Sequence, residues 1–206
     1  MAEKIKNIVL DLAGVVLNLD LERDTAALNS IGLPDFEGCL EDKEIATPLL
    51  AYLNGLMETK AFCEAMHPLC SKDATNDDIL YAMDAVLDVI PRERIDLIIA
   101  LRKKYKVYLL SNIYETAWNY AIGEIEKHGV SLNDCFDKVF LSYEMHLAKP
   151  DTRIFMEMIK ETSINPSETL YFDDSRSNVQ AGKEVGFISY LVPMNGLDEM
   201  LKKLCF

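Results

Sequence analysis

Asp11 is the residue of this sequence best placed to do chemistry. It directly follows an apolar run, residues 5–10, and stands three positions before Gly14. In open sheets of parallel strands, reactive groups lie at the carboxyl ends of the strands, in turns that glycine keeps open. We therefore take Asp11 as the candidate nucleophile.

A pair of carboxylates, Asp173 and Asp174, follows a second apolar run at residues 169–172. Adjacent carboxylates repel each other unless a cation lies between or beside them. Mg²⁺ takes hard oxygen ligands of this kind, in general one or two carboxylates with several waters. The pair therefore predicts a magnesium site, although a single Asp-Ser in such a turn is more often a helix cap.

Groups suited to an anion follow two further runs. Ser111 and Asn112 come after residues 106–110, where a hydroxyl and backbone N–H groups near a helix start can hold phosphate oxygens; the alternative is an ordinary helix cap. Lys149 follows the run at residues 138–141 and precedes Pro150. A lysine there is usually solvated, but beside a carboxylate and a phosphate its ammonium neutralises both.

These residues require an arrangement in which strand ends meet. Strands in which apolar and polar residues do not alternate suit a sheet that is buried on both faces. Helical patterns separate the later strands of this sequence. The strands are expected at 5–10, 106–110, 138–141, 169–172 and 188–192, and the helices at 91–105, 115–128, 150–162 and 178–185. Strand and helix thus alternate, which predicts a doubly wound α/β domain with a parallel sheet.

The segment 21–89 is the exception, because it is helical without a convincing strand. Turn signals at 31–34, 47–48, 54–55 and 71–76 divide it into about four short helices. We therefore expect a core domain at 1–18 and 90–206, with an all-helical cap at 19–89 inserted after the first strand. A cap at that position forms a lid over the strand ends.

Four groups of residues resemble, in their order along the chain, the motifs of the haloacid dehalogenase (HAD) superfamily, whose members are mostly phosphohydrolases. The groups are Asp11 with Gly14 and Val15, then Ser111, then Lys149-Pro150-Asp151 with Phe155, and last Asp173-Asp174. The resemblance covers essentially the whole chain, including the position of a small helical cap. It implies a Rossmann-like core and attack of Asp11 on phosphorus to give a phospho-aspartate. It also implies phosphate binding by Ser111 with Asn112 and Lys149.

The same resemblance implies a Mg²⁺ ion held by Asp11, Asp174 and the backbone carbonyl of Ala13, with Asp173 helping directly or through water. In the superfamily's phosphatases an aspartate stands where this chain has Ala13, and it protonates the leaving alcohol and then activates water. General acid help contributes about 10²–10⁴ in rate, and a methyl group supplies none. Sugar-phosphate phosphatases whose first motif reads Asp-Leu-Gly also lack this acid, and the chain looks most like that branch.

We therefore expect a Mg²⁺-dependent phosphomonoesterase of a small phosphorylated metabolite such as a sugar phosphate. Ala13 is compatible with full, reduced or no activity. An enzymatic alternative is a 2-haloacid dehalogenase. Its chemistry needs no metal, so the carboxylate pair Asp173-Asp174 argues against it. The other alternative is a catalytically impaired haloacid dehalogenase-like (HAD-like) protein that only binds a phosphorylated ligand.

Composition limits the partners. A formal net charge of −13 argues against nucleic acid and anionic membranes, and the five scattered cysteines are expected to be reduced. The start lacks a signal-peptide pattern and no apolar stretch reaches membrane length, so a cytoplasmic protein is expected.

Cys63, His67 and Cys70 share a helix face, but three ligands with Pro68 among them favour buried packing over zinc. Nothing in the pattern predicts an oligomeric state.

Overall fold

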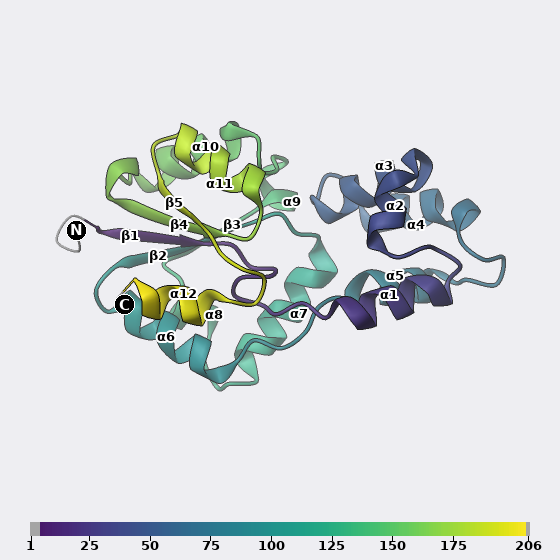
Figure 1. Cartoon of the computed structure of the whole chain (residues 1–206), viewed down its shortest axis with the longest axis horizontal. Coiled ribbons are helices and arrows are strands. Elements are labelled where there is room, and N and C mark those ends of the chain that lie inside the picture. Colours follow the sequence, from purple (N-terminus) through teal and green to yellow (C-terminus); the bar gives the residue numbers. More distant parts are fainter. Residues whose placement is uncertain (1–4, 205–206) are drawn as a thin grey trace.

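The computed structural model describes residues 5–204. Within them the chain forms one sheet of five parallel strands in the order β3-β2-β1-β4-β5, shown in Figure 1. This confirms the predicted doubly wound α/β class. The strand bounds are β1 Asn7–Leu10, β2 Lys106–Ser111, β3 Lys138–Leu141, β4 Thr169–Asp173 and β5 Ile188–Leu191.

The sheet is covered by helices on both faces, as a buried parallel sheet requires. Alternate residues of β1 face opposite layers: Val9 packs with Phe155 and Tyr171 on one side, and Ile8 and Leu10 belong to the larger cluster on the other. In Figure 1, α10 (Thr152–Thr162) and α11 (Arg176–Glu184) cover the upper face, and α6 (Arg92–Arg102), α8 (Leu132–Cys135) and α12 (Leu197–Lys203) lie below.

Helix starts differ slightly from those predicted. Pro91 is the N-cap of α6, and α10 begins only at Thr152, because the Asp151 side chain caps it by accepting from the Arg153 N–H at 2.9 Å. α7 spans Glu115–Glu126. Two four-residue helices, α8 and α9 (Ser142–Met145), and the late α12 were not predicted. The four-residue pair is too short for helical periodicity to show.

Five helices between residues 21 and 84 form a separate group beside the sheet (Figure 1). We keep 19–89 as the proposed cap. Its elements are α1 Leu21–Ser30, α2 Phe36–Glu41, α3 Lys43–Leu53, α4 Thr59–Met66, α5 Asn76–Asp84 and the 3-10 turn His67–Leu69. Three of the four predicted breaks lie between these helices.

The predicted break at Thr47-Pro48 is wrong, because Pro48 lies inside α3. A proline removes one backbone hydrogen bond, here to the carbonyl four residues earlier. The helix continues because Ile45, Leu49 and Tyr52 bury one face of it. The chain instead turns between α2 and α3, where Asp42 ends one helix and caps the next.

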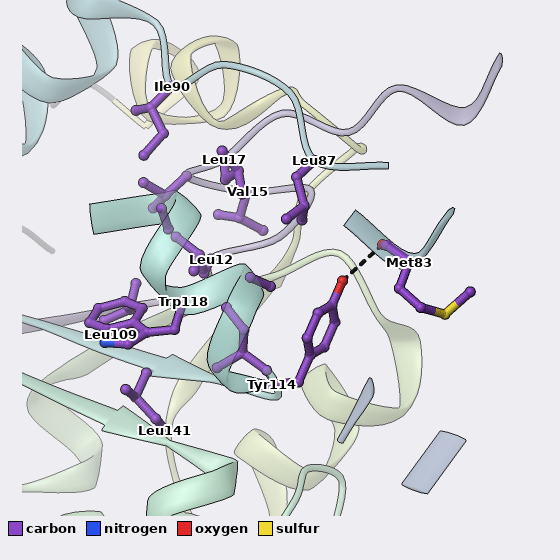
Figure 2. Close-up of a cluster of buried hydrophobic side chains, with 14 of the residues drawn as sticks. Leu12, Val15, Leu17, Met83, Leu87, Ile90, Leu109, Tyr114, Trp118 and Leu141 are labelled. Atoms are coloured by element: carbon purple, nitrogen blue, oxygen red, sulfur yellow. Dashed lines mark hydrogen bonds between the residues drawn. The ribbon is translucent and has the colours of Figure 1, made fainter. Parts of the chain in front are cut away.

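The cap is joined to the core by two antiparallel connections. The Asn18 N–H donates to the Val89 carbonyl, and the Asp88 N–H donates back to the Asn18 carbonyl. A third tie comes from α7, whose N-cap residue Tyr114 donates its hydroxyl to the Met83 carbonyl of α5 at 2.8 Å, as Figure 2 shows. The cap therefore lies beside the carboxyl ends of the strands, where these hydrogen bonds connect it to the core.

The turn after β1 folds back as a short flap, residues 12–19. Leu12, Val15 and Leu17 are buried beside Leu109 of β2 and Trp118 of α7 (Figure 2). Trp118 is thus a core residue. The flap is apolar on its inner side, so the segment that carries the candidate nucleophile is fixed against the sheet.

Arg94 of α6 clamps the outer side of this flap. Its side chain is 1% exposed and donates to the Val16 carbonyl at 3.1 Å and the Asn18 Oδ1 at 2.7 Å. It also donates to the Asn195 carbonyl and pairs with Asp198 at 2.8 Å. One buried guanidinium thus connects the flap to the C-terminal segment.

Replacing Arg94 with methionine should lower the free energy of unfolding by about 3 kcal/mol, since breaking a buried ion pair costs about 3–5 kcal/mol and Asp198 keeps some contact with water. Arg92→Met is the matched control, because Arg92 is an exposed arginine of the same helix paired with Asp96; its loss should stay below about 1 kcal/mol. Urea denaturation measures both. Equal losses would contradict the clamp.

Candidate active site

Asp11 lies just beyond the end of β1, and its backbone N–H donates to the Phe172 carbonyl of β4. The carboxylate is buried, and its Oδ1 accepts from the Leu12 N–H at 2.7 Å and contacts the Lys149 Nζ at 2.9 Å. Its Oδ2 accepts no hydrogen bond within residues 5–204. One oxygen is therefore fixed and the other is available for a ligand.

Lys149 lies between two carboxylates. Its Nζ is 2.9 Å from the Asp11 Oδ1 and 2.7 Å from the Asp173 Oδ2, and it donates to the Leu110 carbonyl of β2 at 2.9 Å. The side chain has no exposure, so Lys149 is not the solvated lysine of the alternative interpretation. Burial works against its charge, but Asp11 and Asp173 hold the pKa of Lys149 above its usual value.

Asp173, the last residue of β4, is fully enclosed. Besides Lys149, its carboxylate accepts from the Tyr171 hydroxyl, from the Ser175 N–H at 2.8 Å and from the Asn178 Nδ2. Burial alone would raise its pKa, but the Lys149 charge and these hydrogen bonds hold the pKa of Asp173 below its ordinary value. Its geometry is that of an anchor for the lysine.

Asp174 differs from its neighbour because it is only half-buried. Burial, together with the adjacent Asp173 charge, raises the pKa of Asp174 to about 6. Burial and the charges of Asp173 and Asp174 likewise raise the pKa of Asp11 to about 8, against the opposing effect of Lys149. Within the described residues, the one group of three carboxylates able to share a metal ion is Asp11, Asp173 and Asp174, whose ligand atoms lie within 4.8 Å of one another.

Two features of the flap fit a ligand at this group. Gly14 has φ +76°, and a Cβ there would lie 2.2 Å from the Asp174 Oδ2, so only glycine leaves this carboxylate its place. No backbone N–H of residues 5–204 donates to the Ala13 carbonyl. Asn195 holds the turn by donating its N–H to the Gly14 carbonyl at 2.7 Å.

The structure places Ser111 at the buried end of β2, one residue beyond Leu110, whose carbonyl binds Lys149. Its hydroxyl donates to the Asn112 carbonyl at 3.3 Å. The Asn112 side chain is occupied by protein partners: its Oδ1 accepts from the Lys149 N–H, and its Nδ2 donates to the Lys149 carbonyl and to the Asn54 Oδ1. The geometry gives Asn112 a part in placing Lys149, and substrate binding by Ser111 and Asn112 stays a prediction.

A cavity of about 670 Å³ lies between the cap and the core. Ala13 and Asn112 border it from the core, and α1, α3 and α5 contribute the opposite wall, largely apolar. Its size is that of a small-molecule pocket. Ala13 borders this space, whereas Asp11 and Lys149 are not among the residues that line it.

Some residues of the site were missed by the sequence analysis. Tyr171 and Asn178 hold Asp173, and Asn54 of the cap holds Asn112. Asn178 could have been found, because it stands one helical turn after the acidic pair. Tyr171 and Asn54 carry no such signal, since one reads as an apolar strand residue and the other as a turn residue.

The group Cys63, His67 and Cys70 does not form a metal site within residues 5–204. Cys63 is buried, whereas His67 is exposed and its Nε2 bonds to the Asn76 Oδ1 at 2.6 Å. Cys39, Cys63, Cys70 and Cys135 are free thiols, and Cys205 lies outside the described residues. No helix of the described part is long and apolar enough to cross a membrane.

The sequence model of the haloacid dehalogenase-like hydrolase family matches residues 5–186, nearly the whole chain. The chain belongs to the haloacid dehalogenase-like hydrolase family. The predicted family is thus confirmed, and with it the expectation that this protein is a hydrolase.

A D-ribitol-5-phosphate phosphatase of Bacteroides thetaiotaomicron is 37% identical over 196 residues, which cover 94% of each chain. A HAD family enzyme of the same organism, crystallised as the wild-type protein with magnesium and inorganic phosphate, superposes with a TM-score of 0.81 at 33% identity and covers 92% of this chain and 95% of its own. A HAD-like hydrolase of Porphyromonas gingivalis reaches a TM-score of 0.84 at 32% identity, with 98% of both chains covered.

Gly14→Ala should weaken binding of Mg²⁺ by about 10- to 100-fold, because the new Cβ displaces the Asp174 carboxylate. Gly129→Ala is a matched control, since Gly129 has φ +73° but nothing within 4 Å of an added Cβ. Both variants carry similar backbone strain, so only the steric effect differs. Calorimetric titration with Mg²⁺ measures it, and equal affinities in the two variants would contradict this role of Gly14.

Proposed function

We propose that this protein is a Mg²⁺-dependent phosphomonoesterase that acts on a small phosphorylated sugar or polyol through a phospho-aspartate on Asp11. The observation that carries the proposal is the arrangement of Asp11, with one oxygen fixed by Leu12 and Lys149 and the other available. The similarity to a D-ribitol-5-phosphate phosphatase along nearly the whole chain supports the substrate class.

The residues present fit a magnesium ion. Three carboxylates and one ammonium leave an excess of negative charge at the group Asp11, Asp173 and Asp174. Asp11, Asp174 and the Ala13 carbonyl would hold the ion, with Gly14 leaving room beside Asp174. Asp173 is already saturated by Lys149, Tyr171, Ser175 and Asn178, so we assign it an indirect part. When bound, Mg²⁺ supplies charge neutralisation for the phosphate group.

Asp11 attacks phosphorus with its Oδ2 while Oδ1 stays fixed, and the bond from phosphorus to the leaving oxygen breaks as the bond to Oδ2 forms. A water molecule then attacks the phosphorus of the phospho-aspartate, which releases inorganic phosphate and restores the Asp11 carboxylate. Phosphoryl transfer depends mainly on positioning and electrostatics, and the residues around Asp11 provide both. Lys149 opposes the charge of the transferring group from a position that Asp173 and the Leu110 carbonyl fix. Ser111 directly follows Leu110, whose carbonyl accepts from this lysine, and would contact phosphate oxygens with its hydroxyl or its backbone N–H.

Ala13 supplies no proton to the leaving oxygen. Its methyl group borders the cavity where an acidic side chain would otherwise face the leaving alcohol. The departing oxygen then takes its proton from water or from another donor, and good leaving groups react faster. A site that loses this acid still keeps the nucleophile and the lysine.

The two alternatives are weaker. A 2-haloacid dehalogenase displaces halide from carbon and has no use for an acidic pair around the nucleophile. A protein that only binds a phosphorylated ligand would gain nothing from a buried carboxylate whose repulsion toward an incoming phosphate weakens binding. The enclosed ion pair of Lys149 with Asp11 and Asp173 therefore favours catalysis.

Wild-type protein with Mg²⁺ should release phosphate from p-nitrophenyl phosphate and, more slowly, from alkyl phosphates, because Ala13 cannot protonate the poorer leaving group. Asp11→Asn and excess EDTA should each abolish release. A phosphate-release assay across both ester types measures this. Binding of phosphate esters without any release would support the non-catalytic alternative, and full activity in EDTA would overturn the proposed mechanism.

Asp174→Asn should weaken the binding of Mg²⁺ more than Asp173→Asn does, whereas Asp173→Asn should lower the free energy of unfolding more. Asp173 is the buried partner of Lys149, and its neutralisation leaves an ammonium less compensated; breaking such a pair costs about 3–5 kcal/mol. Metal titration and urea denaturation of both variants give the two rankings. Identical rankings in the two measurements would show that the division of labour is misassigned.

A further inference from the structure

Asp24 is an acidic residue at an inward-facing position of the cap. On α1 it shares the buried face with Ala27 and Leu28, at helical spacing. Such a position normally carries an apolar side chain, and Asp24 is only 7% exposed. A residue that breaks the local pattern without an evident structural gain points to function.

The carboxylate of Asp24 has no partner within residues 5–204: neither a hydrogen-bond donor nor a cation reaches it. Burial raises the pKa of Asp24 to about 6, with no neighbouring charge or hydrogen bond contributing. Buried carboxylates are otherwise paired or hydrogen-bonded, because desolvation without compensation is unfavourable. The Asp24 oxygens are not among the fully buried side-chain atoms without a partner, so they keep contact with solvent while no protein group within residues 5–204 donates to them.

Asp24 lines the cavity of about 670 Å³ that Ala13 borders from the core. Thr25, half-buried beside Asp24 on α1, also lines the cavity, and the remaining polar groups of the lining are already engaged or exposed. Asn112 and Asn54 bond to each other and to the backbone, Asp35 caps α2, and Glu37 is exposed. Asp24 is thus the enclosed acceptor that a ligand in the cavity would meet.

The cavity lining within the described residues contains no lysine, arginine or histidine. Together with the acidic Asp24, this disfavours a leaving group that carries a second phosphate or a carboxylate. Hydroxyl groups are the favoured donors, since a hydroxyl bonded to a carboxylate forms a short, charge-assisted hydrogen bond. The apolar remainder of the wall suits the carbon chain of such an alcohol.

We propose that Asp24 is a specificity-determining residue, whose carboxylate accepts hydrogen bonds from hydroxyl groups of an uncharged polyol leaving group. This inference rests on the proposed function, because it concerns the alcohol part of a phosphate ester whose phosphate lies at Asp11. It narrows the substrate class to esters with hydroxyl groups and one anionic group.

The test compares ribitol 5-phosphate with n-pentyl phosphate, which has the same chain length and no hydroxyl groups, in the presence of Mg²⁺. Wild-type protein should prefer the hydroxylated ester. Asp24→Ala should lower kcat/KM for ribitol 5-phosphate by about 10- to 100-fold, the size expected for a hydrogen bond to a charged group, and leave pentyl phosphate unchanged. Asp24→Asn, which keeps an uncharged acceptor, should fall in between.

Glu22→Ala is the matched control, because Glu22 is an exposed acid in the same first turn of α1. It should leave both substrates unaffected. A thermal melt at pH 7 gives a second readout: both Asp24 variants should melt at or above the wild-type temperature, since they remove an unpartnered buried carboxylate. A structural role would lower it.

Equal losses on both esters would overturn the inference and make Asp24 a proton donor or a structural residue. An unchanged ratio of the two substrates in Asp24→Ala, or wild-type protein without a preference for the hydroxylated ester, would overturn it as well. Turnover of n-pentyl or p-nitrophenyl phosphate would in those cases leave the proposed function standing. No turnover of any ester by wild-type protein would overturn both.

Discussion

The ammonium group of Lys149, enclosed between Asp11 and Asp173, is the interaction on which the rest of the site depends. An unpaired lysine at this depth would lose its charge, and two carboxylates at this separation without it would repel each other. Each member therefore makes the burial of the others tolerable. The strand order places β1 and β4 side by side, with β2 on the other flank of β1, so that their carboxyl ends supply both carboxylates and the Leu110 carbonyl.

A second layer of contacts keeps this ion pair in register. The flap after β1 is apolar inside and is clamped outside by Arg94 and Asn195, which fixes where Gly14 passes Asp174. On the opposite flank, Asn112 bonds both backbone groups of Lys149. Asp11 and Lys149 thus owe their positions to anchoring of the surrounding backbone by Arg94, Asn195 and Asn112.

Much of this could be predicted from the sequence. Apolar runs that each end in Asp11, Ser111 or Asp173 define parallel strands, and parallel strands bring their ends to one edge. The helical insert is visible because strand patterns are missing from it. The break at Pro48 was wrong, since burial of one helix face outweighs one lost hydrogen bond, and the six-residue α2 is too short to show a period.

Other parts of the site could not be predicted in this way. Asp24 reads as one of many acids in a strongly acidic chain, and only the structure shows that it points inward without a partner. Asn54 and Asn112 read as turn and cap residues, because their mutual contact joins segments that are far apart in the sequence. The separate roles of Asp173 and Asp174 depend on hydrogen bonds from Tyr171 and Asn178, which local patterns do not encode.

The paired connections between cap and core have a consequence for how such a protein can change. Because Asn18 and Val89 are hydrogen-bonded neighbours, the insert leaves and re-enters the core at nearly the same point, and its length adds little to the entropy of closing the chain. The insert can therefore diverge, lengthen or be exchanged between relatives while the core keeps its geometry. The hydrogen bonds that such an exchange must preserve include those from Tyr114 to the Met83 carbonyl, from Thr116 to Asp84 and from Asn112 to Asn54. Asn195 adds two more with the backbone of Leu19.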